Sequence, residues 1–307
     1  MSELAIDTSR KSSDGIEKVA IKVADIKTEA AIFSDSYLPD ALRLALDYAG
    51  DDGFAASLPQ LLHARVSADY DSIIRNTWFT CNSEENLVHT PQGNKTLVTV
   101  HGGGVFATPE RIEKLFHSNV SRHCKTGFTG LFAAKITEQE AGDVLRGNLP
   151  DGSKIPVYSF DEFKRGITDL PRRYAVVMDF EMAKQCKNGY AAFDDLKDDP
   201  LMIVRAGGTE AAASYLDKAR LRHNTAVMGS WHSYSDPYLN PEELQTTVPI
   251  MSGNQGGVDS DKDDYKIRGM DSDFGLRSGD SVICVARYVA VAPQNRKISV
   301  RDIPFTV

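Results

Sequence analysis

The stretch Lys95–Asn119 reads KTLVTVHGGGVFATPERIEKLFHSN, and the rest of the sequence is organised around it. Its first residues form a short apolar run typical of a β-strand, which ends in His101 and the three glycines Gly102–Gly104. Thr108 and Pro109 then open a helix, because proline suits the first helical turn. The sequence therefore predicts a strand, a glycine corner with unusual backbone freedom, and a helix, and the corner is the first candidate site.

The residues before this stretch predict the other arm of a β-hairpin. Thr77–Cys81 (TWFTC) and Glu85–Thr90 (ENLVHT) are rich in strand-forming residues. Pro91–Asn94 (PQGN) is a turn sequence in which Gly93 tolerates a positive φ. We therefore expect the strand that enters the glycine corner to be antiparallel to the strand before it.

Further elements follow from hydrophobic periodicity and capping signals. Residues 17–26 alternate as an amphipathic strand, and 41–50 place their apolar side chains on one helical face that ends at Gly50. A further helix is predicted at 57–66. Two sequences of the form S/T-x-x-E, beginning at Thr137 and Ser159, predict capping boxes that each begin a helix.

The second half alternates between strand and helix patterns. Strands are expected at 172–180, 201–208 and 224–234, and helices at 181–189 and from Thr209 onward. Such alternation favours an α/β or α+β fold with a mixed β-sheet flanked by helices. Two strongly β sequences near the end, SVICVARYVAVA and KISVRDIPF, predict a β-hairpin at the C-terminus.

The domain organisation follows from changes in composition along the chain. Residues 1–15 are polar and predict a disordered tail, while 16–307 form a single globular domain, with two lobes that could meet near residue 150. Ser235–Asp273 contains three prolines, several glycines and a run of aspartates, which predicts a long loop. Loops of that length are usually functional lids or partner-binding surfaces, or else mobile.

The overall composition excludes several classes of protein. The 307 residues are 41% hydrophobic and carry a net charge of −8, which is ordinary for a globular protein and disfavours nucleic acid as the main partner. The N-terminus has no apolar signal region, and no apolar run is long enough to span a bilayer. The four cysteines lack C-x-x-C spacing and are expected to be reduced. These features predict a soluble, cytoplasmic protein without a membrane partner.

The glycine corner admits three chemical interpretations. His101 and Gly102–Gly104 resemble the oxyanion-hole loop of lipases and esterases of the α/β-hydrolase fold, but no G-x-S-x-G nucleophile motif follows. Gly102–Ala107 also has the form G-x-G-x-x-A of a dinucleotide-binding site. In such a site the helix begins within the glycines, so Pro109 would lie inside the helix, where it breaks the hydrogen bonding. The acidic residue expected about 20 positions later is also absent. The remaining interpretation is that glycine N–H groups hold an anion or another polar ligand, or that the corner is only a tight turn.

A second glycine corner is predicted in the second half of the chain. Gly207 and Gly208 precede Thr209 at the start of a predicted helix, and Arg205 lies just before them. A cation beside free backbone N–H groups is suited to an anionic ligand. The alternative is again a tight turn in which only glycine fits.

Polar residues at strand ends suggest a catalytic pair. Asp179 ends one predicted strand, and His232 lies near the end of another. If these strands were parallel neighbours, both residues would meet Arg205 and Gly207 at one edge of the sheet, where an Asp–His pair could perform general acid–base catalysis. The alternatives are that Asp179 caps the next helix and that His232 is a packing residue.

No metal or cofactor can be assigned from the sequence. The histidines and the cysteine within His101–Cys124 lack the close pairs typical of zinc sites. The acidic run that starts at Asp259 departs from the EF-hand pattern at Asp264 and Met270. A solvated acidic loop is expected there, and the alternative is an adventitious Ca²⁺ or Mg²⁺ site.

Two hypotheses of function follow. In the first, the chain binds a small polar or anionic ligand at the glycine corners and could be an enzyme, with Ser235–Asp273 as its lid. In the second, it is a non-catalytic protein that assembles with itself or with a partner through an exposed edge strand such as residues 281–292.

Overall fold

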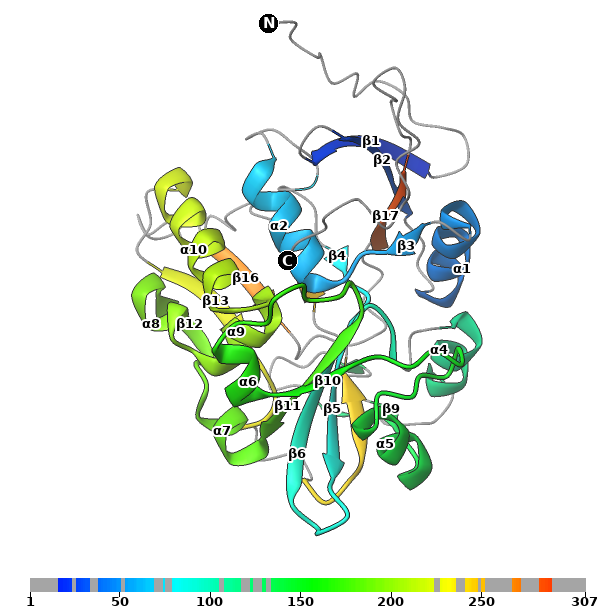
Figure 1. The fold of residues 1–307 in the computed structure, drawn as a ribbon, viewed down its shortest axis with the longest axis vertical. Helices are drawn as coiled ribbons and strands as arrows, with labels where there is room; N and C mark the ends of the chain where they lie inside the picture. Colours follow the sequence, from blue (N-terminus) through cyan, green and yellow to red (C-terminus); the bar gives the residue numbers. More distant parts are fainter. Residues whose placement is uncertain are drawn as a thin grey trace, which may run out of the picture.

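A computed structural model of the chain shows a mixed α/β fold, which confirms the fold class predicted from the sequence (Figure 1). The residues that the structure describes are 16–23, 26–33, 38–50, 53–68, 74, 79–104, 108–116, 122–123, 129–130, 134–223, 227–235, 241–247, 250–251, 267–271 and 282–288.

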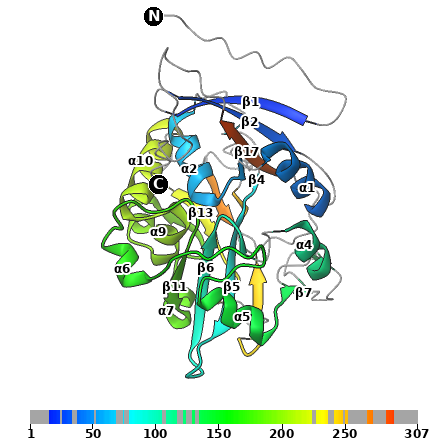
Figure 2. The same ribbon diagram turned by 45° about the vertical axis from the view of Figure 1, so that its right-hand side comes forward.

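One sheet, called sheet I, contains strands from both ends of the chain. Its order is β1 (Ile16–Val23), β2 (Ile26–Phe33), β17 (Val282–Tyr288), β4 (Phe79–Thr80), β15 (Ile250–Met251), β16 (Ile267–Asp271), β13 (Val227–Trp231) and β12 (Gly189–Ala192), with β3 (Phe54–Ala55) paired to β17. The strands β1, β2 and β17 lie together at one end of the molecule, next to α1 (Leu38–Ala49) and α2 (Leu58–Ser67) (Figure 2).

The second sheet, sheet II, carries the sequence stretch on which the fold depends. Its order is β10 (Val157–Ser159), β11 (Tyr174–Asp179), β6 (Lys95–His101), β5 (Ser83–His89), β14 (Gln245–Thr247) and β9 (Ala134–Lys135). The strands β7 (Arg122–His123) and β8 (Thr129–Gly130) form a separate pair.

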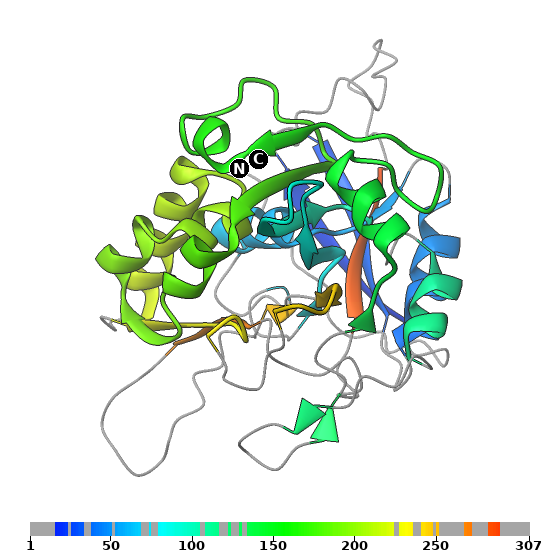
Figure 3. The same ribbon diagram turned by 90° about the horizontal axis from the view of Figure 1, so that it is seen from below.

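Helices lie on both sides of sheet II (Figure 3). On one side are α6 (Phe160–Lys164), α7 (Phe180–Gln185), α8 (Phe193–Lys197), α9 (Pro200–Ala206) and α10 (Thr209–His223). On the other are α1, α4 (Pro109–Phe116) and α5 (Glu138–Leu145). Because helices cover both faces, β6 is buried on both: Leu97 belongs to the core on the α9 side, and Val98 and Val100 belong to the core on the α5 side.

The predicted hairpin is confirmed. Strands β5 and β6 pair antiparallel from Ser83–His101 to His89–Lys95, and Gly93 adopts a φ of +83° in the turn. Both predicted capping boxes are also present, at Thr137 before α5 and at Ser159 before α6. The glycine corner therefore connects the predicted strand to the predicted helix α4, as expected.

The predicted strand at 201–208 is wrong, because these residues form helix α9 and its C-terminal cap. Asp199 caps the helix by accepting a hydrogen bond from the N–H of Met202 (2.9 Å), Pro200 occupies the first turn, and Gly207 ends the helix with a φ of +93°. The run Leu201–Val204 is fully buried, so it is apolar on every face. Periodicity cannot distinguish a short, fully buried helix from a buried strand.

The loop predicted at Ser235–Asp273 contains three strands, β14, β15 and β16, so it is not irregular throughout. Residues 252–266, including the acidic run, lie outside the described residues. Strand β17 pairs with β2 on one side and with β3 and β4 on the other, so residues 282–288 are not the edge strand that the sequence suggested. The second arm of the predicted C-terminal hairpin and the tail at 1–15 also lie outside the described residues.

Candidate functional site

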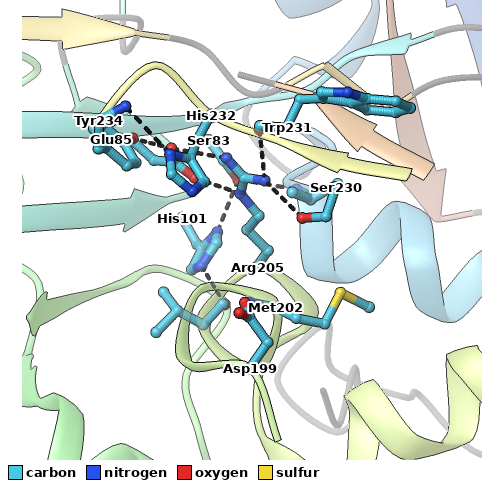
Figure 4. Close-up of polar contacts among 12 residues, drawn as sticks. Ser83, Glu85, His101, Asp199, Met202, Arg205, Ser230, Trp231, His232 and Tyr234 are labelled. Atoms are coloured by element: carbon cyan, nitrogen blue, oxygen red, sulfur yellow. Dashed lines mark hydrogen bonds and ion pairs between the residues drawn. The ribbon is translucent and has the colours of Figure 1, made fainter. Parts of the chain in front are cut away.

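A fully buried ion pair lies at the centre of the polar groups that the sequence singled out. Arg205 binds Glu85 in a bidentate arrangement, with Nε 2.7 Å from Oε1 and Nη2 3.1 Å from Oε2, and both side chains are completely buried (Figure 4). The hydroxyl of Tyr234 also donates to the carboxylate of Glu85. Bidentate guanidinium–carboxylate pairs of this kind are among the strongest side-chain interactions.

The remaining donors of Arg205 reach the end of β13. Its Nη1 donates to the carbonyl of Trp231 at 3.1 Å and to the hydroxyl of Ser230 at 3.4 Å. Glu85 lies on β5 of sheet II, Arg205 on α9, and Ser230 and Trp231 on β13 of sheet I, so one guanidinium joins all three elements. Arg205 therefore makes its hydrogen bonds to Glu85, Ser230 and Trp231 inside the protein.

His101 is held in one neutral tautomer by its neighbours. The register of β5 against β6 places Ser83 opposite His101, and the Ser83 hydroxyl accepts a hydrogen bond from the N–H of Leu58 (2.9 Å). That hydroxyl can then donate its proton to His101 Nδ1 (2.8 Å), and His101 Nε2–H donates to the carbonyl of Val204 on α9 (3.0 Å). Burial lowers the pKa of His101 to about 4, so the ring is uncharged at neutral pH.

His232 is bound on both ring nitrogens as well. Its Nε2–H donates to the carbonyl of Cys186 at 3.2 Å, and its Nδ1 accepts from the backbone N–H of Tyr234 at 3.2 Å. Burial, followed by the positive charge of Arg205, lowers the pKa of His232. The ring stacks on that of Tyr234, with 5.1 Å between centroids. Both ring nitrogens and one face of the His232 ring therefore have partners within the protein.

Asp179 and His232 are not brought together. Asp179 is exposed and caps α7 by accepting a hydrogen bond from the N–H of Met182 (3.1 Å). Cys186, whose carbonyl binds His232, is the residue that ends the same helix. A helix of this length spans about 9 Å, so the carboxylate and the imidazole lie at opposite ends of α7.

The first glycine corner is closely packed. The N–H of Gly102 donates to the carbonyl of Asn82 at 2.8 Å. A Cβ at Gly103 would lie 2.7 Å from Arg173 Nη2, and a Cβ at Gly104 would overlap the buried carboxylate of Glu84. Glycine is therefore required at this corner by close approach and by positive φ, which is +90° at Gly104.

The second glycine corner is the C-terminal cap of α9. The N–H groups of Gly207 and Gly208 donate to the carbonyls of Val204 (3.2 Å) and Ile203 (2.9 Å), which is the hydrogen bonding of a helix end. The hydroxyl of Thr209 donates to the carbonyl of Lys164 at 3.2 Å. Arg205 thus lies on α9, and His101 binds the Val204 carbonyl of the same helix. The two glycine corners are separate, because Gly102–Gly104 follow β6 whereas Gly207 and Gly208 end α9.

Ser83, Glu85 and Tyr234 also belong to this network, although they are not among the site residues predicted from the sequence. The available signal was the polar run Ser83–Asn86 (SEEN) directly before Leu87 and Val88 in a predicted strand. All four residues are buried, and their alternation sends Ser83 and Glu85 toward α9 and the other two toward the opposite core. Consecutive polar residues in a strand buried on both faces require polar partners on both sides.

The described residues offer no group of three or more His, Cys, Asp or Glu side chains that could hold a metal ion. Cys81 and Cys186 are free and buried, and burial raises the pKa of both thiols to about 12. Among the described residues, no helix is long and apolar enough to cross a membrane.

Comparison with known proteins identifies the fold. No protein-family profile and no curated protein sequence matches the chain. The chain is similar to a solved structure described as "Accommodation of massive sequence variation in Nanoarchaeota by the C-type lectin fold". The two share 20% sequence identity with a TM-score of 0.55, and the match covers 87% of this chain and 100% of the other. This likeness shows a fold of the C-type lectin kind.

The packing at Gly104 can be tested against Gly166, a glycine with nearly the same φ. We expect Gly166→Ala, at a φ of +94° with no heavy atom within 4 Å of the new Cβ, to cost about 1–2 kcal/mol of unfolding free energy. Gly104→Ala should cost a further 1–3 kcal/mol or so, because its Cβ also displaces Glu84. Urea unfolding of both variants measures the difference, and equal losses would contradict the close packing.

The neutral state of His101 predicts acid sensitivity. The unfolded chain binds a proton near the ordinary pKa of 6.5, whereas the folded chain resists protonation until about pH 4. The free energy of unfolding should therefore fall as pH is lowered through this window, by about 3 kcal/mol from this residue.

Urea unfolding of the wild type and His101→Gln between pH 7 and pH 4.5 measures this contribution. The variant is expected to be less stable at pH 7 but to lose less stability on acidification. The same pH dependence in both proteins would show that His101 is not the group responsible.

Proposed function

We propose that the chain is a ligand-binding domain in which the buried polar network is scaffold and exposed side chains recognise the ligand. The observation that carries this proposal is that the polar groups expected to act as a site bind one another. Arg205, Glu85 and Tyr234 are buried and mutually hydrogen-bonded, and both ring nitrogens of His101 and of His232 have partners within the protein. Groups engaged in this way support a fold rather than meet a substrate.

The similar solved structure supports the same division between scaffold and surface. Its description says that a C-type lectin fold accommodates massive sequence variation in Nanoarchaeota. A fold can accommodate variation only if the residues that vary are not those that hold the core together. In this chain, the network around Arg205 would be the constant part, and exposed positions would determine what is bound.

A small anionic ligand at the glycine corners, as the sequence suggested, is less favoured. The first corner is packed against the buried carboxylate of Glu84, which would repel an anion. At the second corner, the N–H groups of Gly207 and Gly208 are used in capping α9. Cytoplasmic location and self-assembly stay predictions from the sequence.

The proposal is tested by binding and by the fate of the ligand. Thermal shift and calorimetry are run with panels of nucleotides, phosphorylated metabolites, neutral oligosaccharides and peptides. Any ligand found is then titrated into the wild type, His232→Gln and Asp179→Asn, and recovered for mass spectrometry. We expect the affinity to change less than about threefold in either variant, an effect below about 0.7 kcal/mol, and the ligand to be recovered unchanged.

Two results would contradict the proposal. Conversion of the ligand, abolished in His232→Gln or Asp179→Asn, would instead support the catalytic pair predicted from the sequence. Absence of binding across all four panels would count against a ligand-binding domain.

A further inference from the structure

The chain continues beyond β13 in a short segment, residues 232–235, that we call the β13 extension. Hydrogen bonds to the residue before β12 hold both of its ends. The backbone N–H of His232 donates to Oδ1 of Asn188 at 3.2 Å, and Nδ2 of Asn188 donates to the hydroxyl of Ser235 at 3.0 Å. The conformation of the extension therefore depends on a few identifiable contacts.

The ring of His232 also binds the backbone of its own segment. Its Nδ1 accepts from the N–H of Tyr234 at 3.2 Å (Figure 4), and its Nε2–H donates to the carbonyl of Cys186 at 3.2 Å. The His232 and Tyr234 rings stack with their planes 15° apart, and the Tyr234 hydroxyl donates to Glu85 on β5. The neutral ring with its proton on Nε2 is the form that fits both ring contacts.

A second proton on the His232 ring would reverse one of these two contacts. Protonation places an N–H on Nδ1, which would then face the backbone N–H of Tyr234, and two donors cannot form a hydrogen bond with each other. The contact with the carbonyl of Cys186 is kept, because Nε2 donates in both forms of the ring. The group that has to move is therefore the peptide of Tyr234.

The charged groups around His232 come from two neighbouring elements. Arg205 and Asp199 face it from α9, and Glu85 faces it from β5. Burial, followed by the positive charge of Arg205, lowers the pKa of His232, whereas the hydrogen bond to Cys186 and the two carboxylates act in the opposite direction. The thiol of Cys186, at the end of α7, is uncharged because burial raises its pKa to about 12.

We propose that His232 is a proton-sensitive latch for the β13 extension: the neutral ring holds the Tyr234 peptide in place, and the protonated ring releases it while both sheets stay folded. An opened ring meets water and regains the ordinary pKa of 6.5, so the open form binds a proton more readily than the closed form. The closed form is fully favoured above about pH 6.5 and loses that advantage as the pH falls.

Opening of the latch differs from acid unfolding of the whole chain. Local opening breaks the few contacts of one segment and therefore costs less free energy than unfolding. Strands β5 and β6 should accordingly stay paired at a pH at which the β13 extension has opened. This inference is independent of the proposed ligand, because it concerns only contacts within the chain.

NMR spectroscopy of the ¹⁵N-labelled full chain between pH 7.5 and pH 5 tests the latch. The imidazole ¹⁵N shifts report the protonation of His232, and the amide of Tyr234 reports the hydrogen bond. We expect the Tyr234 amide shift to follow the His232 titration, with a midpoint below pH 6.5. Its exchange protection, corrected for the intrinsic effect of pH, should fall about tenfold by pH 5. The amides of Leu97 and Val98 in β6 should keep their protection.

The matched variant is His232→Asn. The Oδ1 of asparagine branches from Cγ as Nδ1 does in histidine, so it can accept from the N–H of Tyr234, and it does not titrate. Protection of the Tyr234 amide in this variant should stay constant from pH 7.5 to pH 5. The control is His89→Gln, which removes a histidine that contacts the carbonyl of Pro241 and should leave the wild-type transition unchanged.

The proposal is overturned if the Tyr234 amide does not respond while His232 takes up its proton, or if the His232 ring stays neutral down to pH 5. An equal loss of Tyr234 protection in His232→Asn would overturn it as well. So would loss of protection at Leu97 and Val98 at the same pH, because the whole chain would then be unfolding. This last comparison uses the wild type alone and does not depend on the folding of a variant.

Discussion

The buried pair of Glu85 and Arg205 is the interaction on which the arrangement of this protein depends. Removing two charges from water costs several kcal/mol per ion, and only close, well-oriented partners offset that cost. In this protein the ion pair and its partners come from three parts of the fold. Glu85 lies on β5 of sheet II and Arg205 lies on α9. The carbonyl of Trp231, which accepts from Arg205, belongs to β13 of sheet I, and Tyr234, which donates to Glu85, follows that strand. An arrangement that separated sheet I, α9 and sheet II would leave these charges uncompensated.

The two buried histidines extend the same constraint. His101 ties the end of β6 to α9 through the carbonyl of Val204, and His232 ties the end of β13 to α7 through the carbonyl of Cys186. Each imidazole joins a strand end to the C-terminal end of a helix: Val204 lies in the last turn of α9, where its carbonyl also accepts from the N–H of Gly207, and Cys186 ends α7. The polar groups near the glycine corner thus connect strand ends to helix ends.

Local features of this fold could be predicted from the sequence, and long-range ones could not. The β5–β6 hairpin, the capping boxes at Thr137 and Ser159 and the helix begun by Pro109 each depend on a few neighbouring residues. The residues of helix α9 resemble a strand in sequence because burial on all sides removes the periodicity of their apolar side chains. Glu85 and Arg205 lie 120 residues apart, so nothing local in the sequence could pair them. The order of strands in sheet I, with β17 inside the sheet and β12 at its described end, is likewise a long-range property.

A double-mutant cycle on Glu85 and Arg205 tests the central claim most directly. Glu85→Gln and Arg205→Met remove one partner each, and each should cost about 3–5 kcal/mol of unfolding free energy because the other charge stays buried and uncompensated. The double variant should lose less than the sum of the two by at least about 2 kcal/mol. Losses that add to within about 0.5 kcal/mol would show that the two charges are not coupled in the folded protein, and the pair could not then be the interaction that fixes sheet I, α9 and sheet II together.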